Sequence, residues 1–306
     1  MTINSALAHN MNRVLKWLGY GFGGLVGLVA IAVVAIYFRS EWVRSKTWEV
    51  PAAAVTMSSA AIDQADVDEG RRLAQIFGCF NGCHGQRSDG GVFLDIPNVV
   101  KLVAPSLTHL ASTAEDADLV RSIRFGIKQD GTTVWGMPSA ALYHLTDAQL
   151  ASIIAFIRSE PVGDPVEERS AFRPLSRLGI AMGDFRPQAE STSAMPERLD
   201  PEQPGDPHAA GRQIAMTACA ECHGLDLQGN PQFPSPALGI VRAYDQDAFR
   251  HFITTGEALG GRDVGVMTQM AIRRFSVLHV EEVDQLHAYL SETGGLDRMN
   301  SESLDQ

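Results

Sequence analysis

Two short clusters, each ending in a cysteine followed directly by a histidine, are the residues of this sequence best suited to carry chemistry. Residues 219–223 have the pattern Cys-x-x-Cys-His, and residues 79–84 have the related pattern Cys-x-x-x-Cys-His. The Cys-x-x-Cys-His pattern is the attachment signature for c-type haem. Two thiols on one helical turn can add across the two vinyl groups of the porphyrin, and the adjacent histidine then supplies the iron with an imidazole nitrogen. We therefore expect a covalently attached haem at each cluster, through Cys79, Cys83 and His84 in the first and through Cys219, Cys222 and His223 in the second.

The first cluster departs from the signature because three residues, rather than two, separate its cysteines. The extra residue must loop out if both sulfurs are to reach their vinyl carbons. Asn81 and Gly82 lie in this interval, and both residue types tolerate left-handed backbone angles. We expect two thioethers here, with one thioether and one free thiol as the alternative.

Two other uses of the cysteines stay open. Four thiols and two imidazoles could bind zinc, since structural zinc sites use similar short spacings. Each cysteine pair could instead form a disulfide. Neither reading is favoured, because zinc does not explain the repeated residues downstream and disulfides give His84 and His223 no role beside the second cysteine.

A haem iron held by one histidine needs a sixth ligand or an open site, and a thioether sulfur opposite imidazole raises the reduction potential. Met137 and Met267 are the candidates because they hold equivalent positions in two copies of a repeated pattern. Met270 competes with Met267, because an alignment of the two copies that is counted back from Leu278 pairs Met270 with Met137. The gap-free alignment that favours Met267 matches Gly126, Gly131 and Met137 with Gly256, Gly261 and Met267.

Each proximal histidine needs a partner for its other ring nitrogen, which fixes the tautomer and the ring orientation. Pro105 and Pro236 lie between the cluster and the methionine in each copy, and their carbonyl groups are suitable acceptors. The alternative is that both are ordinary turn prolines.

The repeat extends to the elements that must position these residues. Gly70-Arg71 aligns with Gly211-Arg212, and each copy ends in an amphipathic helix. The first such helix begins at Thr146, with Gln149 as its capping-box partner, and the second begins near His279. Helical periodicity dominates and no alternating strand run is convincing, so we expect both modules to be all-α.

No charged residue occurs from Trp17 to Phe38, which is long enough to cross a bilayer as a helix. A cleaved secretory signal, with Ala52–Ala54 as its processing site, is the alternative. Seven prolines favour extended chain in the linker, although an apolar patch there (Leu175, Leu178, Ile180 and Met182) is a candidate short helix between the modules. We divide the chain into an anchor (1–38), a stalk (39–65), a first module (66–160), a proline-rich linker (161–205), a second module (206–296) and a tail (297–306).

Both modules resemble class I c-type cytochrome domains, and the tandem resembles membrane-anchored dihaem cytochromes c of bacterial respiratory chains. The resemblance implies helices packed round two covalently attached haems. It implies a single pass through the bacterial inner membrane with the haem domains in the periplasm, because this haem attachment is completed outside the cytoplasmic membrane. It implies His84 and His223 as proximal ligands, Met137 and Met267 as distal ligands, and Pro105 and Pro236 as supports for the histidines.

The expected function is electron transfer rather than enzymatic catalysis. Two irons with both axial positions filled can pass single electrons, and the anchor would keep the protein beside membrane dehydrogenases or a terminal oxidase as a carrier or a cytochrome subunit. A dihaem cytochrome c peroxidase is the alternative enzyme, and a zinc-dependent binding module is a third hypothesis. The 306 residues carry a net charge of −11, which argues against nucleic acid as a partner.

Overall fold

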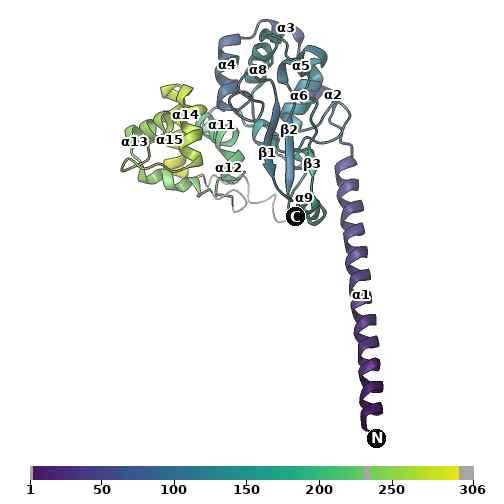
Figure 1. Ribbon diagram of the computed structural model, residues 1–306. Coiled ribbons are helices and arrows are strands. Elements are labelled where there is room, and N and C mark those ends of the chain that lie inside the picture. The colour runs from purple at the N-terminus through teal and green to yellow at the C-terminus, as the bar shows by residue number, and fades with distance from the viewer. Residues whose placement is uncertain (1–2, 231–234, 296–306) are drawn as a thin grey trace.

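The computed structural model describes residues 3–230 and 235–295, so the expected tail at 297–306 lies outside the described residues. One long helix leads into two helical modules that lie side by side, and the second module is drawn in green and yellow (Figure 1). Helix α1 (Ile3–Ser45) projects away from both modules, and within it Leu15–Ser45 is long and apolar enough to cross a membrane, judged by length and composition.

The first module is built on two packed helices, α4 (Val67–Ile76) and α8 (Asp147–Ser159). The predicted capping box is present, because Thr146 and Gln149 each bond the other's backbone N–H. At the crossing, a Cβ on Gly70 would lie 1.9 Å from the carbonyl oxygen of Ser152, so only glycine fits. The remaining helices before α8 are α2 (Ala52–Val55), α3 (Ser59–Asp63), α5 (Leu107–Thr113), α6 (Asp116–Phe125) and α7 (Ser139–Leu142).

The second module repeats this crossing with α11 (Ala209–Ile214) and α15 (Val280–Thr293). A Cβ on Gly211 would lie 2.1 Å from the carbonyl oxygen of Gln285. The glycine pair that aligns in sequence therefore permits the same close helix contact in both modules. The other elements are the π-helix η1 (Ala215–Cys219), α12 (Ala220–His223), the 3₁₀ helices η2 (Leu238–Ala243) and η3 (Phe275–Val277), α13 (Gln246–Thr255) and α14 (Val266–Arg273).

A small sheet corrects the expectation that both modules are all-α. Strands β1 (Gly91–Ile96), β2 (Val100–Ala104) and β3 (Ala171–Phe172) form an antiparallel sheet in that order. Strand β2 alternates between buried and half-buried positions, the pattern of a strand with one face on the core. The alternation covers five residues and β1 is mostly exposed, so the period was too short to stand out from the sequence.

The linker is ordered and covers the first module. It contains β3, α9 (Pro174–Met182) and α10 (Gln188–Ser193), and Thr192 Oγ1 donates to the carbonyl of Phe125 at 2.8 Å. The short helix expected at the apolar patch is present as α9, but it packs against α1 rather than between the modules.

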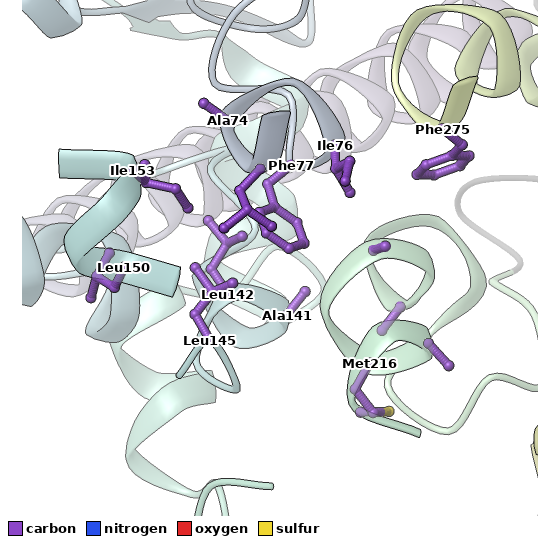
Figure 2. Packing of buried hydrophobic residues seen from close by; sticks show 14 of the residues in the cluster. Ala74, Ile76, Phe77, Ala141, Leu142, Leu145, Leu150, Ile153, Met216 and Phe275 are labelled. Carbon is purple, nitrogen blue, oxygen red and sulfur yellow. The ribbon is translucent and has the colours of Figure 1, made fainter. Parts of the chain in front are cut away.

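One apolar core continues from the first module into the second. Figure 2 shows Ile76, at the end of α4, next to Phe275 of η3, with Ala141 of α7 facing the turn that carries Met216. Because apolar side chains of both modules share this core, the modules pack as one body rather than as beads on a linker.

Candidate functional site

The first cluster follows a helix that has just ended. Helix α4 stops at Ile76, and Gly78 has a φ of +71°, which turns the chain away from the helix axis. Asn81 has a φ of +54°, and its N–H bonds the carbonyl of Gly85 at 2.9 Å. The interval with the extra residue therefore forms a tight loop, in which Asn81 takes the left-handed conformation that the sequence predicted.

The second cluster lies inside continuous helix. The backbone passes from α11 through the π-helix η1 into α12, and the cluster ends where Gly224 takes a φ of +82°. A π turn is a rare local widening of a helix that is frequent at functional sites. Cys219 closes the π turn and Cys222 lies one α turn further on. The shorter spacing therefore needs no loop.

Each motif histidine contacts the carbonyl oxygen of its proline. His84 Nδ1 lies 3.0 Å from Pro105 O, and His223 Nδ1 lies 2.8 Å from Pro236 O. A carbonyl oxygen can only accept, so Nδ1 carries the hydrogen and Nε2 is the nitrogen left to ligate a metal. Burial lowers the pKa of both imidazoles, and the proline oxygen opposes this in part. The rings are thus oriented and held in the neutral form that coordinates iron.

Two glycines that sequence reasoning missed let the histidine approach the proline. The N–H of Gly90 bonds the carbonyl of His84 at 2.9 Å, and the N–H of Gly229 bonds the carbonyl of His223 at 2.8 Å. A Cβ on Gly90 would lie 2.5 Å from the carbonyl carbon of Pro105, and one on Gly229 would lie 2.6 Å from a backbone oxygen in the corresponding segment. Their equal spacing after the histidine is the signal that could have revealed them.

None of the four cysteines forms a disulfide in the described part of the chain, and all four residues are half-buried. Burial raises the pKa of the Cys79 and Cys219 thiols to about 12, although the positive charge of Arg274 opposes the increase. Before haem is attached, these two thiols are therefore protonated at neutral pH. Among the described residues, no three His, Cys, Asp or Glu side chains converge on a point that could hold a metal ion, so the zinc reading has no site there.

Arg274 joins the two clusters, and sequence reasoning missed it. Its Nε donates to the carbonyl of Ile76 at the end of α4, at 2.7 Å. Its Nη1 lies 2.9 Å from the carboxylate of Glu221, the residue beside Cys222. The guanidinium is buried. Burial raises the pKa of the thiols of both clusters, and the positive charge of Arg274 opposes that increase. Both clusters therefore face one ion pair at the boundary between the modules.

Further polar contacts fix this boundary. Arg72 of α4 bonds Glu282 of α15 through both carboxylate oxygens, at 2.7 and 2.8 Å. Gln213 of α11 donates to the carbonyl of His144 at 3.1 Å and to Gln149 at 2.9 Å. These contacts connect the same four helices that make the two glycine crossings, so the orientation of the modules is specified at several points.

The candidate sixth ligands lie in different local structures. Met137 follows Gly136, whose φ is +80°, in the loop before α7. Met267 and Met270 are both on α14, half-buried and packed against the core. Residues three apart on a helix share a face, so both sulfurs lie on the same side of α14. Their placement favours neither methionine.

The residues present fit a covalently bound haem at each cluster. Each offers two unbonded thiols and an imidazole whose Nδ1 is engaged, so that Nε2 can bind iron. Half-buried methionines packed against the core, Met137 in the first module and Met267 and Met270 in the second, offer the thioether donor that such an iron would accept.

Two family models match the chain. Residues 65–157 match the model described as cytochrome c oxidase, cbb3-type, subunit III, and residues 208–294 match the model described as cytochrome c. None of the curated proteins compared with the chain matches it. The two matched segments contain the two Cys-His clusters and their prolines. Beyond α1, the chain therefore carries two cytochrome c domains, which implies covalently bound c-type haem and haem-based electron transfer.

Proposed function

We propose that this protein is a membrane-anchored dihaem c-type cytochrome that passes single electrons between redox partners of a bacterial respiratory chain. The observation that carries the proposal is the shared geometry of the two clusters, in which His84 and His223 each bind a proline carbonyl through Nδ1. A bound haem supplies one-electron chemistry at its iron. Each module would hold one haem through its two cysteines and its histidine, with Met137 in the first module and either Met267 or Met270 in the second as a further donor to iron.

The contact between the modules supports electron transfer within the chain. The charge of Arg274 acts on all four thiols, and its guanidinium contacts the end of α4 and Glu221, so both clusters lie near the boundary between the modules. Haems held at the two clusters would therefore lie within one packed body, which favours transfer of an electron between them.

Helix α1 serves as a retained anchor rather than a cleaved signal. Ser40 near its end is fully buried, and Arg177 Nη1 donates to Ser40 Oγ and to Glu41, both at 3.0 Å. The guanidinium of Arg44 lies 4.3 Å from the centre of the Phe172 ring. Cleavage at Ala52–Ala54 would remove these contacts and expose the part of the linker that α1 covers. The proposed side of the membrane is the periplasm, because this type of haem attachment is completed outside the cytoplasmic membrane.

The proposed partners are a membrane dehydrogenase or a terminal oxidase. One matched model describes an oxidase subunit, which supports a place beside or within such a complex. The net charge of −11 would speed encounter with a basic partner surface at low salt.

The mass of the purified chain tests the covalent haems. After acid denaturation we expect the polypeptide plus two haems, and one haem fewer when Cys219 and Cys222 are both replaced by serine. The pair Cys79→Ser and Cys83→Ser is the matched variant for the first module. A polypeptide that weighs no more than its amino acids would refute the proposal.

Spectra of single-methionine variants identify the sixth ligands. We expect a low-spin ferric spectrum with a sulfur-to-iron charge-transfer band, half of which is lost in Met137→Ala. Of Met267→Ala and Met270→Ala, only the ligand's variant should lose the other half. Met137→His should lower the potential of that haem while leaving its attachment intact. A high-spin ferric haem with peroxide turnover in the unmodified protein would favour a peroxidase instead.

A further inference from the structure

We propose that helix α9 lies on the lipid surface beside α1, with its exposed apolar face among the headgroups and upper acyl chains. This proposal rests on the proposed membrane anchor. It adds a second membrane contact that would fix the tilt of the haem domains relative to the bilayer.

The exposed face of α9 is apolar. Leu175, Leu178 and Met182 are 56%, 37% and 67% exposed, and their spacing of three and four residues places them along one side of the helix. Ser176 and Ile180, also four residues apart, are buried. The helix is therefore amphipathic, and its apolar exposed side is covered by no described part of the chain.

Contacts with α1 set the height of α9 along the anchor. The guanidinium of Arg177 lies 4.3 Å from the centre of the Tyr37 ring and bonds Ser40. Arg39 donates to the carbonyl of Ala181 at 2.9 Å. The uncharged run of α1 ends at Phe38. Helix α9 is thus held at the level where α1 leaves the hydrocarbon core.

The exposed apolar side of α9 lies roughly opposite its buried side. At about 100° per residue, Leu178 lies on a different side of α9 from Arg177, which contacts α1, and from Ile180, which is buried. Figure 1 shows α9 at the end of the first module that lies nearest to the free length of α1. The turn between β1 and β2 adds to this surface, because Asn98 accepts from the backbone N–H of Leu175 and Ile96 is exposed.

A lipid surface suits these side chains better than a protein partner. Apolar side chains flanked by arginines are the composition of helices that lie in the plane of the headgroups. Arg39 and Arg186 are exposed at the end of α9, where their guanidinium groups can meet lipid phosphates while the aliphatic stems stay beside the apolar side chains. The continuity of this surface with the uncharged run of α1 identifies the bilayer as the occupant.

Spin labels on the full-length, haem-loaded chain in nanodiscs of phosphatidylcholine and phosphatidylglycerol test the proposal. Three variants are compared, each with one label whose position is checked by mass: Leu178→Cys on α9, Val280→Cys on the exposed side of α15, and Val29→Cys within α1. We expect the label at 178 to lose most of its collisions with a water-soluble nickel relaxant and to gain collisions with oxygen, as the label at 29 does. The label at 280 should stay accessible to nickel.

The outcomes separate the two proposals. If the label at 29 is in lipid while the label at 178 is as accessible to nickel as that at 280, α9 does not lie on the membrane and the anchor still stands. That result would also be expected if the face docks another protein. If the label at 29 is itself accessible to nickel, the membrane anchor fails, and the proposal for α9 fails with it.

Discussion

The two Cys-His clusters have the same chemical groups on different backbones. In the first module the helix ends before the cluster, and the cysteines lie on a loop that Asn81 closes with a positive φ. In the second module the helix runs through the cluster by way of a π turn. The histidine nevertheless meets its proline oxygen at nearly the same distance in both, 3.0 and 2.8 Å.

This difference shows which part of the module is constrained. The histidine and the proline are 21 residues apart in the first module and 13 in the second, because β1 and β2 occupy the longer interval. The glycine that allows their approach, Gly90 or Gly229, is in the same place in both. The imidazole-carbonyl contact is therefore conserved between the modules, while the thiol spacing and the intervening chain vary.

The largest expected effect tests whether the modules share their helix crossing. Gly70→Ala and Gly211→Ala each place a methyl group within about 2 Å of a backbone oxygen, which cannot move aside as a side chain can. We expect each to destabilise the protein by about 4 kcal/mol, more than ordinary overpacking. Chemical denaturation followed by circular dichroism measures this. Gly239→Ala is the control, because the new methyl group there makes only ordinary contacts. If Gly70→Ala or Gly211→Ala lowered stability as little as Gly239→Ala does, the shared crossing would be contradicted.

The next effect tests whether the two modules unfold as one unit. Arg274→Gln removes the guanidinium that donates to the carbonyl of Ile76 and pairs with Glu221, so the partly buried carboxylate of Glu221 loses its partner. We expect a loss of about 3 kcal/mol and two separate thermal transitions where the unmodified protein has one. Arg273→Gln, a change at the exposed neighbouring arginine, should leave a single transition. Two transitions in the unmodified protein would mean that the contact does not couple the modules.

The contrast between predicted and missed residues follows the range of their interactions. The capping box at Thr146 is local, so its spacing could be recognised in the sequence. Gly211 could be identified because it aligns with Gly70 in the repeat. Arg274 was missed because its partner Ile76 is 198 residues away, and an arginine beside a second arginine has no periodic signal. The sheet was missed because its buried alternation spans only β2.

Acid should weaken the boundary between the modules through His144. This side chain is fully buried, its Nδ1 accepts from the backbone N–H of Leu199, and its carbonyl accepts from Gln213. Burial, with the nearby charge of Arg198, lowers the pKa of His144 from 6.5 to about 4. The unfolded chain therefore binds the extra proton first, so stability is complete above pH 6.5 and falls as the pH decreases toward 4.

We expect His144 to account for a loss of about 2 kcal/mol at pH 5 relative to pH 7.5. His144→Asn keeps an acceptor for Leu199 but cannot titrate, so its unfolding free energy should change less over that range. His251→Asn replaces an exposed histidine of the second module and serves as the control. Parallel pH profiles for the unmodified protein and His144→Asn would remove His144 as the source.

The smallest effect, and the sharpest test of the comparison, is a pair of glycine substitutions between the cysteines. Asn81 has a φ of +54°, which glycine adopts without strain, whereas Ala220 has a helical φ of −63°, where glycine costs conformational entropy. Asn81→Gly should leave stability unchanged or raise it slightly, and Ala220→Gly should lower it by about 1 kcal/mol. Denaturant midpoints at equal haem content measure both. Because the two substitutions introduce the same residue into corresponding intervals, effects of the same sign would mean that the first cluster is helical like the second, and the contrast between loop and helix would then be wrong.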